Sequence, residues 1–167
     1  MLQPSTEVAQ LKSEPSQLKE AKVEIDWTDP KAQVSKHFTV HEAIYLPTWG
    51  RLATETDGLT DEVKANLITL FAKMDIVREY FGKPINVHVT YRPEEYNKLI
   101  GGAPMSAHKF GKACDFDVSG MNCDDVRSQI MANHLLETWD FRMEMLPGSV
   151  WVHLGNDWKS GIRYFKP

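Results

Sequence analysis

The sequence predicts a single α+β domain, in which a small antiparallel sheet has helices packed on one side. The chain has 167 residues, of which 42% are hydrophobic, so it is long enough for one substantial core and too short for two ordinary domains. Apolar residues first recur with the period of a helix, and shorter segments with strand-like alternation follow them. This order, helices before short strands, is typical of α+β proteins.

The first 30 residues differ in composition from the rest of the chain. They are rich in Ser, Glu, Gln, Lys and Pro, and Pro15 interrupts their one weak helical stripe. We therefore predict a flexible or loosely packed arm over residues 1–30 and a compact domain over residues 31–167. Because no basic start precedes an apolar run of signal-peptide length, we expect synthesis in the cytoplasm without a signal peptide.

A short and a long helix are expected in the first half of the domain. The short one follows Thr39, which has the capping-box spacing to Glu42. The long one spans residues 61–81, since Thr60 can cap its start and Gly82 lies just past its end. Its apolar residues recur at intervals of three and four and form one face, made of Val63, Leu67, Leu70, Phe71, Met74 and Val77.

The second half is predicted to hold short strands and one more helix. Residues 85–90 alternate apolar and polar side chains, as a half-buried strand does, and KACDFDVSG is a second short strand after a glycine-rich loop. A single helix is expected to start after Asn122 and to continue through Leu136. The segments FRMEMLPGSVWVHLG and IRYFKP read as further short strands divided by turns.

Charge and cysteine content exclude several classes of protein. The chain has 19 basic and 23 acidic residues and a formal net charge of -4, so no cationic field is present to attract nucleic acid. No stretch approaches the roughly 18 apolar residues of a membrane span, and we expect a soluble protein without membrane insertion. Cys114 and Cys123 cannot form a disulfide framework and are interpreted as reduced.

The segment SAHKFGKACDFDV contains the most informative side chains. His108 is expected in a loop and Asp115 in the following strand, and the small residues Gly111 and Ala113 allow the sharp turn that brings the two together. His153, in WVHL, would face away from the core while its apolar neighbours point inward. A catalytic zinc ion takes three such nitrogen and oxygen ligands and keeps one position open. These three residues are our candidate metal ligands.

Further motifs are spaced along the chain in a distinctive order. HFTVHEA, VTYRPEEYN, GGAPMSAHKFGKACDFDV and WVHL extend over about residues 36–160, and the most specific part is the S-x-H-x-x-G-x-A-x-D pattern of residues 106–115. This combination resembles the zinc D-alanyl-D-alanine carboxypeptidases and L-alanyl-D-glutamate endopeptidases of the hedgehog/DD-peptidase fold. The resemblance implies that His108, Asp115 and His153 bind Zn²⁺ and that zinc-bound water is the nucleophile.

The resemblance also indicates a general base. Glu144 is the candidate, although it lies nine residues before His153, whereas the base of many family members lies only a few residues before the last ligand. A turn at residues 147–148 between two paired strands would return Glu144 to the metal. The alternative is a solvated strand glutamate, and Asp140 and Asp157 are the reserve candidates.

Two polar residues are candidates for substrate binding. Arg92 ends the VHVT strand, where the family places an arginine that faces the substrate. A guanidinium there can bind a peptide carboxylate or stabilise the oxyanion, and a structural salt bridge is the alternative. Ser106 stands where the family often has a hydroxyl that binds substrate or supports a ligand, and a simple turn hydroxyl is equally compatible. Asp117 shares a face with Asp115 and is either a ligand-orienting or a surface carboxylate. Trp151 replaces a histidine found in related sites.

These features predict a zinc-dependent peptidase of bacterial cell-wall peptides, with peptidoglycan stem peptides as its partners. It would act on amide bonds adjacent to D-amino acids, either as a carboxypeptidase on terminal D-Ala-D-Ala or as an endopeptidase. The expected lack of a signal peptide suggests a phage-type enzyme that reaches the wall through a pore-forming partner or as part of a virion. The alternative is a non-catalytic zinc-binding module for wall attachment or virion structure, which would not need Glu144.

Overall fold

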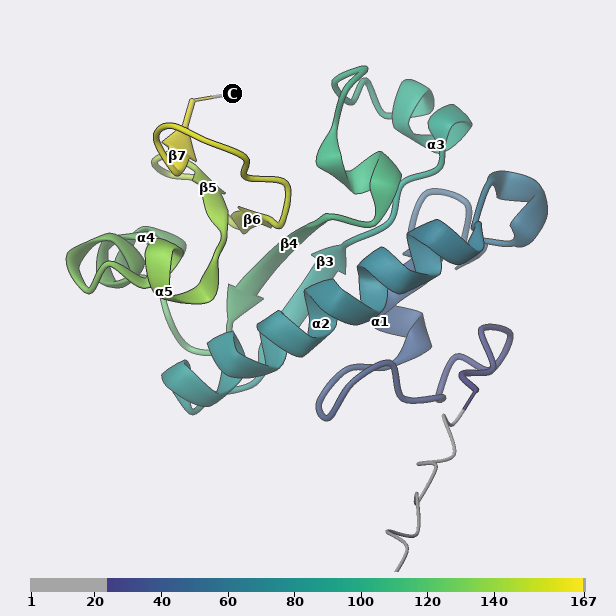
Figure 1. The fold of residues 1–167 in the computed structure, drawn as a ribbon, viewed down its shortest axis with the longest axis horizontal. Coiled ribbons are helices and arrows are strands. Elements are labelled where there is room, and N and C mark those ends of the chain that lie inside the picture. The colour runs from purple at the N-terminus through teal and green to yellow at the C-terminus, as the bar shows by residue number, and fades with distance from the viewer. Residues whose placement is uncertain (1–23, 167) are drawn as a thin grey trace, which may run out of the picture.

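A five-stranded sheet forms the centre of the computed structural model, which describes residues 24–166 (Figure 1). Across the sheet the strands follow the order β3 (Ile85–Val89), β4 (Ala113–Val118), β6 (Val152–Gly155), β5 (Arg142–Glu144) and β7 (Tyr164–Phe165). The predicted antiparallel pairing is confirmed for the first four strands. The last pair, β5 and β7, is parallel instead. The cause is the connection after β6, which passes β5 before the chain joins the edge of the sheet.

The elements that precede the sheet form a small unit beside it. They are α1 (Val40–Ile44), β1 (Tyr45–Leu46), β2 (Arg51–Leu52) and the 3₁₀ turn η1 (Glu55–Asp57). The predicted capping box is confirmed, because the backbone N–H of Thr39 donates to the Glu42 carboxylate at 2.8 Å and the Thr39 hydroxyl accepts from the Glu42 N–H. The antiparallel pair of β1 and β2 was not predicted from the sequence.

The predicted arm over residues 1–30 lies mostly outside the described residues. Its last part is described from residue 24 onward, and Ile25 and Trp27 pack there against the hydrophobic core. This contact joins the end of the arm to the domain.

Helix α2 (Asp61–Phe81) lies along one face of the sheet, as Figure 1 shows. It has the predicted bounds: the Thr60 hydroxyl accepts from the Val63 N–H at 3.3 Å, and Gly82 ends the helix with φ of 61°. All six residues of its predicted apolar face are buried. None of the helices within residues 24–166 is long and apolar enough to cross a membrane.

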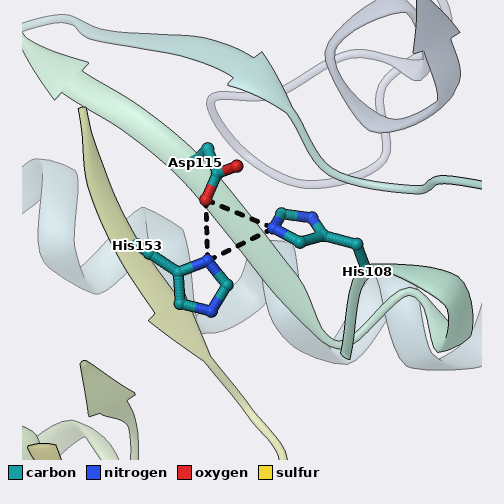
Figure 2. A group of neighbouring side chains, drawn as sticks. All are labelled: His108, Asp115 and His153. Atoms are coloured by element: carbon teal, nitrogen blue, oxygen red, sulfur yellow. Dashed lines mark hydrogen bonds and ion pairs between the residues drawn. The ribbon is translucent and has the colours of Figure 1, made fainter. Parts of the chain in front are cut away.

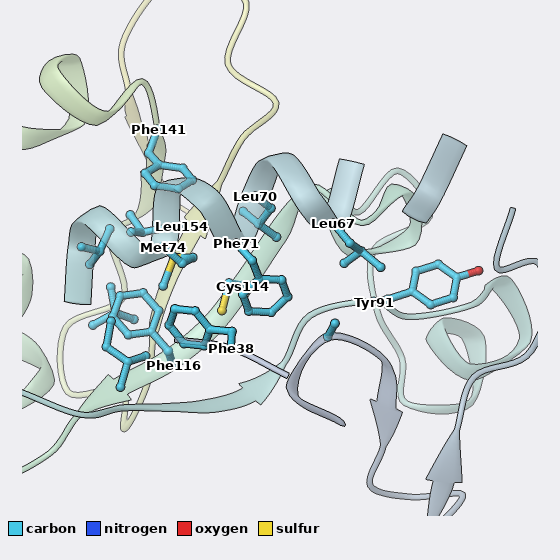
Figure 3. Close-up of a cluster of buried hydrophobic side chains, with 14 of the residues drawn as sticks. Phe38, Leu67, Leu70, Phe71, Met74, Tyr91, Cys114, Phe116, Phe141 and Leu154 are labelled. Atoms are coloured by element: carbon cyan, nitrogen blue, oxygen red, sulfur yellow. The ribbon is translucent and has the colours of Figure 1, made fainter. Parts of the chain in front are cut away.

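The core lies between α2 and the inner face of the sheet (Figure 3). Alternate strand residues point into it, including Cys114, Phe116, Met143 and Leu154, each fully buried. The strand residues next to them therefore point to the opposite face of the sheet, and these include Asp115, Glu144 and His153. The sequence alternation thus separates a packed face from a polar face.

The predicted helix from Asn122 through Leu136 is wrong as a single element. The chain forms α4 (Cys123–Ala132) and then α5 (Leu135–Trp139). His134 separates them, because its φ of 52° lies in the left-handed region and breaks the helical hydrogen bonding. The glycine-rich loop after β3 also contains two short helical elements that were not expected, α3 (Glu94–Leu99) and the 3₁₀ turn η2 (Ala107–Phe110).

Candidate metal centre

Two of the three candidate ligands lie opposite each other on paired strands. Asp115 of β4 is the register partner of His153 of β6, so both side chains point to the same face of the sheet. The Asp115 Oδ1 and His153 Nδ1 atoms are 2.7 Å apart. Their side chains retain 14% and 13% of their exposure, which leaves this side of the pair open to a ligand.

The third candidate, His108, reaches the pair from η2. Its Nε2 atom lies 3.2 Å from both Asp115 Oδ1 and His153 Nδ1, so the three atoms form a triangle (Figure 2). The other ring nitrogen, Nδ1, lies 2.7 Å from the carbonyl oxygen of Thr90. Because a carbonyl only accepts hydrogen bonds, Nδ1 carries the proton and Nε2 directs its lone pair toward the centre of the triangle.

The position of η2 depends on a glycine next to α2. Gly111 has φ of 66°, and a Cβ atom there would lie 2.9 Å from Leu67 Cγ and 3.0 Å from the Val63 carbonyl oxygen. The Asn66 side chain also donates to the Phe110 carbonyl at 2.9 Å. The close approach that Gly111 permits is therefore what holds the His108 loop against the long helix.

The charge states of His108 and Asp115 suit metal binding. Burial lowers the pKa of His108, so its imidazole is neutral at pH 7, the form in which histidine binds metals. Burial alone would raise the pKa of Asp115, but the adjacent His108 and His153 outweigh it and hold that pKa below its usual range. The site thus offers two imidazole nitrogens and one carboxylate oxygen.

This donor set fits zinc. Four ligands placed tetrahedrally at about 2.0–2.1 Å from zinc lie about 3.3 Å from one another. The triangle of His108, Asp115 and His153, with edges of 2.7, 3.2 and 3.2 Å, is close to that spacing before any ion is bound. Within residues 24–166, these three are the His, Cys, Asp or Glu side chains whose ligand atoms lie close enough together to hold one metal ion. They supply three ligands and leave a fourth position for water or substrate.

A pocket of about 410 Å³ opens over the triangle and contains the candidate polar residues. Arg92, Ser106 and Glu144 line it together with Asp115 and His153. An Arg92 Nη2 atom donates to the Ser106 hydroxyl at 3.1 Å, while Arg92 Nε has no acceptor among the described residues. Burial lowers the pKa of Arg92, and the negative charges of Asp115 and Glu144 partly offset that effect.

Glu144 reaches the pocket through the pairing of β5 with β6. Met143 is paired with Leu154, the neighbour of His153, and Glu144 and His153 line the same pocket. The segment between the two strands returns the chain to the metal centre despite the nine-residue separation in sequence. No hydrogen bond to the Glu144 carboxylate is found within the described part of the chain, which leaves this group available to a ligand.

The other acidic candidates differ in position. Asp157 lines the pocket, whereas Asp140 pairs with Lys73 and Arg163 at 3.0 Å and is not among the residues lining it. Asp117 contacts His88 Nε2 at 2.6 Å and is not hydrogen-bonded to a candidate ligand.

Sequence reasoning missed three contributors to the site. The Thr90 carbonyl orients His108, and a backbone acceptor leaves no signal in residue types. Arg142 and Phe165 line the pocket beside Glu144. The spacing of Arg142, two residues before the candidate base on a predicted strand, was the signal that could have placed it on the same face.

The fold and the site together define a class: an α+β domain with a three-ligand metal centre at the floor of an open pocket. The chain belongs to the peptidase M15 family, whose model matches residues 36–154, and members of this family are zinc metallopeptidases. The resemblance identified in the sequence is thereby confirmed at the level of the family, while the phage-type origin stays a prediction. No curated protein matches the chain, and no solved structure matches it.

Proposed function

We propose that the protein hydrolyses amide bonds adjacent to D-amino acids in the stem peptides of bacterial peptidoglycan. The observation that best supports this proposal is the pocket, in which Glu144 and Arg92 flank the metal triangle. A carboxylate can accept and donate the proton in amide hydrolysis, and a guanidinium can stabilise the negative charge that develops on the carbonyl oxygen.

Zinc, when bound by His108, Asp115 and His153, lowers the pKa of water and polarises a carbonyl group. Glu144 accepts the proton from the attacking water and delivers it to the leaving amine, which completes the proton balance of hydrolysis. Its half-buried position beside His153 and its lack of hydrogen bonds to described residues suit a group that must both accept and release a proton.

Arg92 donates hydrogen bonds to a substrate oxygen. Its Nη2 contact with Ser106 fixes the side chain, and most of its five donors remain free for a ligand. Ser106 therefore acts as a positioning residue for Arg92. The same guanidinium suits the terminal carboxylate of a carboxypeptidase substrate or the developing oxyanion of an endopeptidase substrate.

Product analysis after incubation with purified peptidoglycan tests this proposal. The zinc-loaded protein is incubated with several wall types, and released fragments are identified by mass spectrometry. Loss of a terminal alanine is the result expected of a carboxypeptidase, and newly exposed stem or bridge amines are expected of an endopeptidase.

A chelated sample and the Glu144→Gln variant provide the controls: the chelated sample is expected to release no products, and the variant at least about 10²-fold less than wild type. No release by the wild-type protein from any wall type, with one equivalent of zinc bound, would contradict hydrolysis and favour a zinc-binding attachment module.

A further inference from the structure

We propose that Arg142 is a specificity-determining residue that binds a carboxylate of the substrate on the β5 side of the metal centre. This inference rests on the proposed peptidase function and adds a second cationic subsite to it. The ligand chemistry is a carboxylate group, either the terminus of a peptide or the side chain of an acidic residue.

The first support is the position of Arg142 on the polar face of the sheet. It precedes Glu144 by two residues on β5, so both side chains lie on the same face, and both line the pocket. Its register partner is Gly155 on β6, which is in turn paired with Ala113 on β4. Because Gly155 has no side chain, the Asp157 carboxylate and the stem of Arg142 can lie directly over the sheet at this point.

The second support is the way in which the guanidinium is held. Its Cζ atom lies 3.9 Å from the centroid of the Phe165 ring, and one Nη1 atom lies 3.4 Å from Asp157 Oδ2. Gly155 makes this arrangement possible, since a Cβ atom there would lie 2.5 Å from Asp157 Oδ1. The aromatic ring and the carboxylate fix the orientation of the side chain, which reduces the entropy lost when a ligand binds.

The third support is the supply of free donors. Among the described residues, the Arg142 side chain has one polar partner, Asp157, at the long distance given above. The side chain is 31% exposed. A guanidinium has five N–H donors, and here only one of them contacts a protein acceptor, over a long distance. The remaining donors can bind a carboxylate through two parallel hydrogen bonds.

Arg92 and Arg142 occupy different sides of the site. Arg92 follows β3 and Arg142 belongs to β5, so the strands that carry Asp115 and His153 lie between them. Arg92 has a buried Nε atom, and Asp115 and Glu144 lie close enough to it to raise its pKa against the effect of burial. This placement suits Arg92 to the oxygen of the scissile carbonyl and leaves the carboxylate of the substrate to Arg142.

Two pairs of synthetic peptides distinguish the sources of the carboxylate. One pair is acetyl-Lys(acetyl)-D-Ala-D-Ala with a C-terminal acid or amide, and the other is Ala-γ-D-Glu-Lys with the glutamate carboxylate free or amidated. For the pair that the protein recognises, Arg142→Gln is expected to lower kcat/KM for the acid by about 10- to 150-fold, the range for a hydrogen-bonded charge pair, and to leave the amide unaffected. Arg142→Lys should restore part of the loss.

Arg78→Gln is the matched control, since it removes one arginine charge from α2 on the other side of the sheet and should preserve the preference for the acid. Phe165→Leu, which removes the ring under the guanidinium, should give an intermediate loss. Thermal unfolding of each variant verifies that it is folded.

Binding to the zinc-loaded Glu144→Gln protein, measured by calorimetry with the same peptides, separates this inference from the proposed function. A preference for the acid that depends on Arg142, without turnover by the wild-type protein, would support the subsite and contradict hydrolysis. An acid preference that is the same with and without the Arg142 side chain would overturn the subsite, whether or not the wild-type protein is active. The absence of any acid preference would overturn it as well.

Discussion

At the scale of single residues, Glu144 is the side chain whose substitution separates metal binding from hydrolysis. It lines the same pocket as His153 without belonging to the metal triangle, so Glu144→Gln keeps the shape of the pocket and removes the proton acceptor. We expect zinc stoichiometry to stay unchanged and kcat to fall by about 10²- to 10⁴-fold, the usual contribution of a general base. Metal analysis and peptide turnover measure the two quantities.

The matched control is Glu137→Gln, which removes an exposed glutamate from α5 and should keep full turnover. Full turnover by a zinc-loaded Glu144→Gln protein would instead exclude Glu144 as the base. In that case Asp157, the reserve candidate that lines the same pocket, becomes the group to substitute next.

Asp57 links the pH dependence of stability to a single carboxylate. Arg51 donates to both of its oxygens, at 2.6 and 2.9 Å, and the Thr54 N–H donates at 2.8 Å. The Arg51 hydrogen bonds lower the pKa of Asp57 below its ordinary value of 3.8 in spite of partial burial. A carboxylate with a depressed folded-state pKa stabilises the fold above its unfolded-state pKa and loses that contribution as the pH falls.

We therefore expect Asp57→Asn to reduce the free energy of unfolding at pH 7 by about 1 kcal/mol, a modest value because Arg51 is half-exposed. The difference between wild type and variant should shrink as the pH falls below about 4. Urea unfolding at several pH values measures it. A difference that stays constant from pH 7 to pH 3 would show that the Asp57 charge contributes nothing to stability.

At the scale of elements, the contact between η2 and α2 connects folding to the metal centre. Gly111→Ala would force a Cβ atom to within 2.9 Å of Leu67 and impose a φ of 66° on a residue that disfavours it. We expect the free energy of unfolding to fall by about 1–3 kcal/mol and zinc affinity to weaken, because His108 lies on the displaced turn. Chemical unfolding and zinc titration test both effects.

Gly82→Ala separates backbone conformation from packing. Gly82 has a similar φ of 61°, but a Cβ atom there meets no atom within 4 Å. Gly82→Ala should lower the free energy of unfolding by about 1 kcal/mol, because of the left-handed conformation alone, and should leave zinc affinity unchanged. Equal effects of the two substitutions on stability and zinc affinity would contradict the role of the close η2–α2 contact.

The sequence predicted those elements whose ends are set by residues close by in the chain. The Thr39 capping box and the bounds of α2 follow from side chains within a few residues of each helix end. The break between α4 and α5 depends on the left-handed His134, and the parallel pairing of β7 depends on the path of the chain after β6. Neither feature has a local residue pattern, so tertiary context decided both.

At the scale of the whole molecule, the candidate site unites segments far apart in the chain. The His108, Asp115 and His153 ligands lie on η2, β4 and β6, and the motif order indicated this set before the fold was known. The sequence left the position of Glu144 open, because its approach to His153 depends on the register between β5 and β6. The spacing of two residues places Arg142 on the same strand face as Glu144, and the register then places both residues at the pocket.

Because the three ligands join separate elements, zinc should stabilise the folded protein as a whole. A ligand that binds only the folded state at about 100 times its Kd contributes about 2.7 kcal/mol, which corresponds to a rise in Tm of about 5–10 °C for a domain of this size. Thermal unfolding of chelated and zinc-loaded protein measures the shift. Asp115→Ala removes one corner of the triangle and should abolish most of it.

Asp117→Asn is the matched control for that experiment. Asp117 is a carboxylate on the same strand and face as Asp115, but its partner is His88 rather than a metal ligand. The variant should therefore keep the full zinc-dependent rise in Tm even if its baseline Tm changes. A rise in Tm of the same size in Asp115→Ala and in wild type would place the stabilising zinc elsewhere and remove the basis for assigning hydrolysis to this pocket. A rise in Tm that is lost in Asp115→Ala and kept in Asp117→Asn would show that the same zinc ion stabilises the fold and occupies the proposed catalytic site.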